Sequence, residues 1–110
     1  MTHHFGVLIP STNTAVETEL TRLPSGYQAY CARLMTRTPG HPFSPSRDED
    51  IEYQARLLGT AKVKMVILSQ TSASLFADDY DETTTRRISA AARVPAITSA
   101  QAIGRALRAL

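Results

Sequence analysis

Two short, unbroken apolar runs constrain the fold of this chain more than any other feature. Val7–Ile9 and Met65–Leu68 contain no polar residue, whereas a strand with one solvated face alternates apolar and polar residues. An unbroken run is typical of a strand that helices cover on both faces of a parallel sheet. The two runs therefore predict buried strands in an α/β fold.

The rest of the chain alternates between strand-like and helix-like patterns. Strands are expected over Phe5–Ile9, Tyr27–Leu34, Val63–Leu68 and Val94–Ile97. Helices are expected over 14–22, opened by a Thr14–Glu17 capping box, from Ser46 onward, over 78–93, and after a cap at Thr98 or Ser99. This alternation predicts an open parallel four-stranded sheet, in the flavodoxin-like order 2-1-3-4, with helices on both faces.

Length and composition fit one α/β domain over residues 1–110. The net charge of +2 is too small to predict a nucleic-acid partner, and the single cysteine, Cys31, excludes an intrachain disulfide. No apolar run approaches the roughly 20 residues of a membrane span. The first residues lack the pattern of a signal peptide, and we expect the two histidines there to be frayed. A cytoplasmic protein with no nucleic-acid or membrane partner is therefore expected.

Each buried run ends in a polar cluster. Ser11, Thr12 and Asn13 follow the first strand, and Gln70, Thr71 and Ser72 follow the third. The order 2-1-3-4 places these two strands side by side, so both clusters should share one crevice at the carboxyl edge of the sheet. Hydroxyls, carboxamides and free N–H groups are donors that suit a small carboxylate. Ser11, Asn13, Thr71 and Ser72 are therefore the predicted substrate-binding residues.

Other interpretations of these polar residues stay open. Helix capping and turn formation account for part of both clusters, and capping alone explains Thr98 and Ser99. Second-rank candidates are Arg37, His41 and Tyr80. The acidic group at 78–82 suits a helix dipole better than a metal ion, and Cys31 has no neighbour in sequence that would lower its pKa.

The segment Gly6–Glu17 resembles the amino-terminal signature of the maleate cis-trans isomerases. These enzymes belong to the Asp/Glu/hydantoin racemase superfamily, with the arylmalonate decarboxylases as relatives. The similarity continues through Arg33–Met35, Val66–Ser74 and Val94–Leu110. The resemblance implies a protein of two pseudo-symmetric α/β halves with the active site between them, of which this chain is the first half. It also implies an enzyme that needs no cofactor, and the residues themselves predict no metal site.

The resemblance implies roles for single residues as well. Gln70 stands where the family's isomerases carry the first of two cysteines, and a carboxamide can be neither a thiolate nor a base near neutral pH. Any catalytic cysteine would then come from a second half. Three possibilities follow: one half of an isomerase-like or decarboxylase-like enzyme acting on a small dicarboxylate, a non-catalytic carboxylate-binding or regulatory module that forms a homo-oligomer, or an inert fragment.

Overall fold

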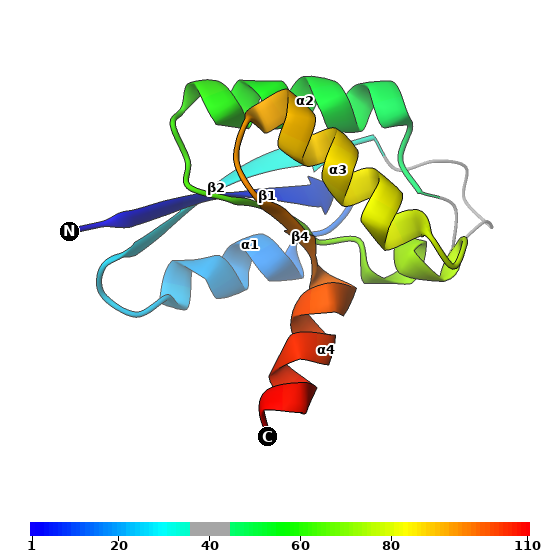
Figure 1. The fold of residues 1–110 in the computed structure, drawn as a ribbon. Coiled ribbons are helices and arrows are strands. Elements are labelled where there is room, and N and C mark those ends of the chain that lie inside the picture. Colours follow the sequence, from blue (N-terminus) through cyan, green and yellow to red (C-terminus); the bar gives the residue numbers. More distant parts are fainter. Residues whose placement is uncertain (36–44) are drawn as a thin grey trace.

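A computed structural model describes residues 1–35 and 45–110 and contains one parallel sheet with helices on both faces (Figure 1). Its strands are β1 (His3–Pro10), β2 (Tyr27–Leu34), β3 (Val66–Leu68) and β4 (Ala96–Thr98), in the order β2-β1-β3-β4. All neighbouring pairs are parallel. The predicted order 2-1-3-4 is confirmed.

The helices divide between the two faces of this sheet. Helices α2 (Asp48–Thr60) and α3 (Tyr80–Ala92) cover one face, whereas α1 (Ala15–Glu19) lies on the other (Figure 1). A short 3-10 helix, η1 (Leu20–Arg22), continues α1, and a second one, η2 (Thr71–Leu75), follows β3. Helix α4 (Ser99–Ala109) extends away from the sheet on the α1 side.

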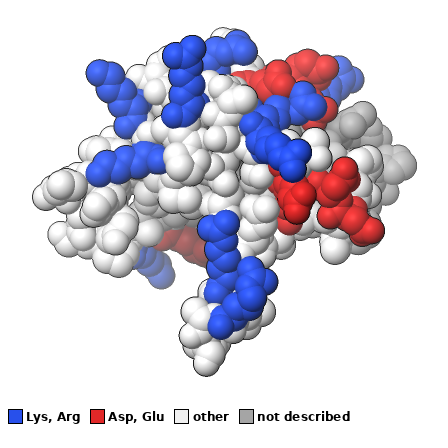
Figure 2. Space-filling view, viewed as in Figure 1, with Lys and Arg blue, Asp and Glu red and all other residues white. Residues whose placement is uncertain are grey.

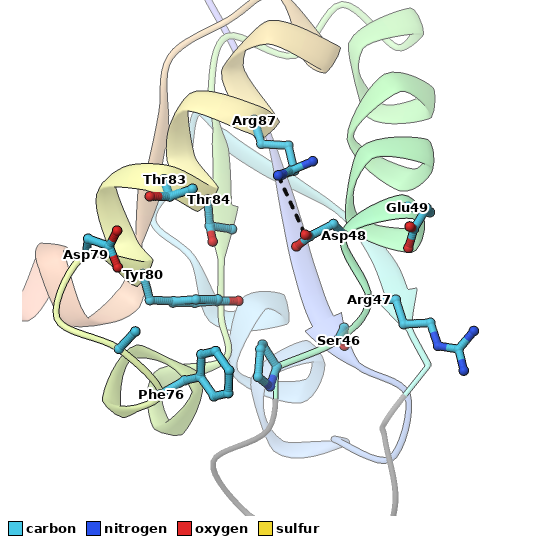
Figure 3. A pocket seen from close by; sticks show the side chains of 12 residues that line it. Ser46, Arg47, Asp48, Glu49, Phe76, Asp79, Tyr80, Thr83, Thr84 and Arg87 are labelled. Atoms are coloured by element: carbon cyan, nitrogen blue, oxygen red, sulfur yellow. Dashed lines mark ion pairs between the residues drawn. The ribbon is translucent and has the colours of Figure 1, made fainter.

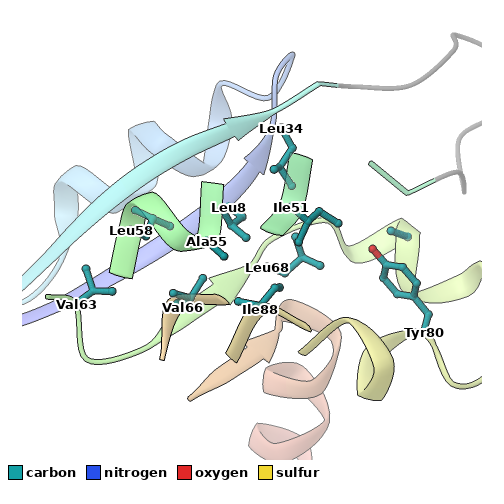
Figure 4. Close-up of a cluster of buried hydrophobic side chains, with 12 residues drawn as sticks. Leu8, Leu34, Ile51, Ala55, Leu58, Val63, Val66, Leu68, Tyr80 and Ile88 are labelled. Atoms are coloured by element: carbon teal, nitrogen blue, oxygen red, sulfur yellow. The ribbon is translucent and has the colours of Figure 1, made fainter. Parts of the chain in front are cut away.

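The main core lies between the sheet and the α2–α3 layer. Leu8 and Leu68 of the sheet pack against Ile51 and Ile88 of the helices, and all four are at most 1% exposed (Figure 4). The helices approach each other closely at Gly59, where a Cβ atom would lie 2.6 Å from the carbonyl oxygen of Ala92. A larger residue at position 59 would push α2 and α3 apart.

Three expectations about local structure were wrong. The side chain of Thr14 makes no cap bond, so the predicted capping box at α1 does not form. The histidines at the amino terminus are not frayed, because β1 begins at His3 and the ring of His4 hydrogen-bonds to the Tyr30 hydroxyl at 2.9 Å. The strand predicted at Val94–Ile97 is β4 at Ala96–Thr98, which begins two residues later and ends one residue later, after Arg93 ends α3 in a left-handed conformation with φ 62°.

None of the helices within residues 1–35 and 45–110 is long and apolar enough to cross a membrane.

Candidate functional site

The two polar clusters leave the sheet from neighbouring strands at the same edge. β1 and β3 pair in parallel, and the N–H of Ser69 donates to the carbonyl of Leu8 at 2.8 Å where the strands end. Residues 11–13 continue from β1, and residues 70–72 continue from β3 into η2. The two polar clusters that were expected to share a crevice therefore follow adjoining strands at one edge of the sheet.

Asn13 shapes the first of these loops. Its N–H donates to the carbonyl of Pro10 at 3.0 Å, and its side-chain oxygen accepts the N–H of Val16 at 3.0 Å. The carboxamide thus caps α1 in place of Thr14. Because the oxygen is used for the cap, the amino group Nδ2 is the donor that remains for a ligand.

Arg33, near the end of β2, hydrogen-bonds to the backbone of the same loop. Its guanidinium donates to the carbonyl oxygens of Ser11 at 3.1 Å and Asn13 at 2.6 Å. It also pairs with the carboxylate of Glu17 at 2.5 Å. The sequence analysis missed this role. The available signal was the position of Arg33 at the carboxyl end of a strand that neighbours β1, in register with Ile9.

Gln70 is held on the interior side of the second loop. Its amino group donates to the hydroxyl of Ser46 at 2.7 Å, and that hydroxyl donates to the carbonyl of Met35 at 3.1 Å. The side-chain oxygen of Gln70 is buried and has no hydrogen-bond partner within the described residues. Ser46, only 3% exposed, is a residue that the sequence analysis did not connect with this loop.

The second loop is also tied to α4. The hydroxyls of Thr71 and Ser99 lie 2.7 Å apart and hydrogen-bond, whereas Ser72 is exposed at the start of η2. Thr98 is buried, and its hydroxyl accepts the N–H of Gln101 in a complete capping box. Capping is therefore the role that the structure gives Thr98, and Ser99 lies beside the predicted site residue Thr71.

A separate pocket opens between the first turns of α2 and α3. It has a volume of about 560 Å³ and is lined by Ser46, Phe76, Tyr80 and Arg87 among others (Figure 3). The guanidinium of Arg87 pairs with Glu52 at 2.7 Å and with Asp48 at 3.6 Å. Burial raises the pKa of Tyr80.

Charge is unevenly distributed over the molecule. Acidic side chains gather where α2 and α3 begin, and most other charged side chains on the visible face, α4 included, are basic (Figure 2). The acidic residues Asp81 and Glu82 bind Ser74 and Arg86, respectively. Within the described residues no three His, Cys, Asp or Glu side chains form a group that could hold a metal ion.

Cys31 lies away from the two polar clusters. Cys31 lies in the middle of β2, where burial and then the charge of Glu17 raise the pKa of its thiol, although Arg33 acts in the opposite direction. A thiol with a raised pKa is a poor nucleophile near neutral pH. Arg37 and His41 lie outside the residues that the structure describes.

Comparison with known proteins identifies the fold. No protein-family model matches the sequence, and no curated protein matches it. The crystal structure of the maleate isomerase Iso from Pseudomonas putida does match, with a TM-score of 0.79 and 21% sequence identity. The alignment covers 99% of this chain and 50% of that one.

A second structure of that enzyme, a cysteine-to-alanine variant with maleate, matches with a TM-score of 0.75 and 18% identity. It covers 99% of this chain and 49% of the other. The fold is that of a maleate isomerase domain. This chain spans about half the length of the solved structures it matches.

Proposed function

We propose that this chain is a small-dicarboxylate-binding unit, the carboxylate-binding half of an enzyme similar to maleate isomerases or arylmalonate decarboxylases. The observation that carries the proposal is the pair of polar loops at the adjoining carboxyl ends of β1 and β3. It is supported by a fold shared with a maleate isomerase. In open α/β sheets such an edge is where small ligands bind.

In this proposal Ser11 and Asn13 bind one side of the carboxylate, and Thr71 and Ser72 bind the other. Asn13 contributes its amino group, which is held in place because the oxygen of the same carboxamide caps α1. The guanidinium of Arg33 holds the loop in this conformation, because it donates to the carbonyl oxygens of Ser11 and Asn13. Fixed donors of this kind also stabilise negative charge that develops on a carboxylate during enolate formation.

Chemistry on the bound acid needs a group that the described residues do not bring to this crevice. Gln70 is a carboxamide that donates to Ser46, and Cys31 is mid-strand with a raised pKa. We therefore propose that a catalytic cysteine comes from a second α/β unit. Helix α4 offers a surface for that unit, because Ile103 and Leu107 are 53% and 65% exposed.

A non-catalytic carboxylate-binding module is the second candidate. It is favoured by the side chain of Gln70, which fills the family's first cysteine position and is hydrogen-bonded to a buried serine. The two candidates predict the same binding and differ in turnover. Incubation of the chain with maleate or an arylmalonate, followed by NMR of the acid, separates them.

Calorimetric titration with maleate tests the binding proposal. We expect Asn13→Ala to weaken maleate binding by more than about tenfold, because a charge-assisted hydrogen bond is lost. Asn13→Asp is the sharper variant: its oxygen keeps the cap on Val16, while its added negative charge repels the ligand. Maleate binding should be abolished in Asn13→Asp with α1 intact. Unchanged affinity in both variants would show that the pocket assignment is wrong.

A further inference from the structure

The carboxamide of Gln70 begins a short chain of hydrogen bonds across the carboxyl edge of the sheet. Its amino group donates to the hydroxyl of Ser46 at 2.7 Å, and that hydroxyl donates to the carbonyl of Met35 at 3.1 Å. Gln70 follows β3 and Met35 follows β2, whereas β1 lies between these two strands. The chain of hydrogen bonds therefore passes the carboxyl end of β1.

The first polar loop leaves the sheet at this same place. The N–H of Ser11 donates to the carbonyl of Leu34 at 2.7 Å, and Met35 is the next residue of the chain. The second polar loop begins at Gln70 itself. The carboxamide of Gln70 therefore lies at the part of the edge where both loops of the proposed carboxylate site begin.

The hydrogen bonds fix which end of the carboxamide faces Ser46. A carbonyl oxygen can only accept, so the single O–H of Ser46 is used by Met35. Ser46 then offers Gln70 only lone pairs, and the amino group must face it. A rotation of the carboxamide by half a turn would bring two acceptor oxygens together. The side-chain oxygen Oε1 of Gln70 is thus held as an acceptor that cannot exchange places with the amino group.

This oxygen lacks a donor. It is buried and has no hydrogen-bond partner within residues 1–35 and 45–110. Gln70 as a whole is only partly buried, so its carboxamide lies close to the surface of the sheet edge. A buried acceptor without a donor is unfavourable, and a hydrogen bond from a ligand would remove no further water from it. The site therefore favours a ligand with an N–H or O–H group directed at Gln70.

A second carboxylate on the ligand would not meet this requirement. A carboxylate only accepts hydrogen bonds, so beside Oε1 it would place acceptor against acceptor. The loop residues 11–14 and 69–74 carry no charged side chain. The guanidinium of Arg33 is already bonded to the carbonyls of the first loop and to Glu17. The two loops therefore supply no counter-charge to a dianion.

We propose that Gln70 selects a monoanion with one carboxylate and one neutral hydrogen-bond donor, such as the monoamide of a small dicarboxylic acid. The two polar loops bind the carboxylate, and the amide N–H of the ligand donates to Oε1 of Gln70. Ser46 is a positioning residue, because it acts only through the orientation of that carboxamide. The inference rests on the proposed function, since it names the class of ligand that the same two loops bind.

Calorimetric titration of the full chain with maleate and with the monoamide of maleic acid tests the proposal. The two acids share one carbon skeleton and differ only at one end. We expect the monoamide to bind at least about tenfold more tightly, because only its amide donates to Gln70. Equal affinities, or tighter binding of maleate, would overturn the inference and leave the proposed carboxylate binding intact. Binding of neither acid would overturn both.

Gln70→Met removes the acceptor and keeps a side chain of similar length. We expect this variant to bind the two acids with affinities within about threefold of each other. Asn13→Ala should instead weaken both acids alike, because it acts on the carboxylate that they share. A preference for the monoamide that survives in Gln70→Met would show that Gln70 does not select the ligand.

Ser46→Ala tests the positioning role, since alanine accepts no hydrogen bond and frees the carboxamide to rotate. We expect maleate to bind more tightly than to the parent chain, and the preference for the monoamide to be lost. A merely structural role would weaken both acids alike and leave their ratio unchanged, which would contradict the assignment of Ser46.

Ser89→Ala is the matched control for Ser46→Ala. The hydroxyl of Ser89 also donates to a backbone carbonyl, that of Val94 at 2.8 Å, but Val94 precedes β4 and lies at the opposite edge of the sheet. This variant should keep the preference of the parent chain for the monoamide. Circular dichroism verifies that each variant is folded.

Discussion

Under the proposed function, Asn13 would combine a structural and a binding role in one residue. Its oxygen caps α1 through the N–H of Val16, and its backbone carbonyl receives the guanidinium of Arg33 at 2.6 Å. Both contacts restrict the carboxamide before any ligand arrives. A donor that is already oriented loses less conformational freedom on binding, so capping and ligand binding support each other here.

The thiol of Cys31 makes the free energy of unfolding depend on pH. Burial raises the pKa of its thiol from the ordinary value of 9.0, so the unfolded chain loses the proton at a lower pH than the folded one. The stability that Cys31 contributes is therefore complete below about pH 9 and is lost as the pH rises through the folded pKa. Urea denaturation between pH 7 and pH 10.5 should show a smaller alkaline loss for Cys31→Ala than for the parent chain. Identical losses would show that the thiol is not desolvated.

Helix caps illustrate what a sequence pattern can and cannot decide. The pattern Thr-x-x-Glu precedes α1, yet Glu17 pairs with Arg33, which lies 16 residues away in sequence. At α4 the pattern of Thr98 and Gln101 does form both reciprocal bonds. A local motif predicts a cap correctly only when no distant side chain competes for one of its members.

At the element scale, we expect Thr98→Val to destabilise the fold by about 1 kcal/mol, because the N–H of Gln101 loses its acceptor in a buried position. Thr14→Val is the matched control, since the side chain of Thr14 makes no cap bond. Its effect should be no more than about 0.5 kcal/mol. Chemical denaturation of the two variants measures the difference, and equal losses would contradict the cap assignment.

The sequence predicted the number and order of the strands better than their bounds. The strand order followed from the alternation of strands and helices, and β2 has the predicted bounds, whereas β3 begins at Val66 rather than at Val63. The contacts of Arg33 and Ser46 were not predicted because they join positions 11 to 24 residues apart, which no local pattern encodes. The 3-10 helix η2 was not predicted for another reason: its sequence also fits an irregular loop.

At the scale of the whole molecule, helix α4 carries exposed apolar side chains, among them Ile103 and Leu107, and has no buried residue. We expect Leu107→Glu to change the free energy of unfolding by no more than about 0.5 kcal/mol, because the side chain is 65% exposed. Thermal denaturation provides the measurement. A loss above about 2 kcal/mol would show that α4 is packed in solution.

The hydrogen bond between Thr71 and Ser99 joins the second polar loop, residues 70–72, to the first residue of α4. A unit that docked on α4 and fixed Ser99 would thereby restrict Thr71 as well. If docking tightened ligand binding by some factor, the ligand would have to tighten docking by the same factor, because the coupling free energy is reciprocal. Binding of a small acid beside Thr71 and docking of a second unit on α4 would then be thermodynamically coupled through this one hydrogen bond.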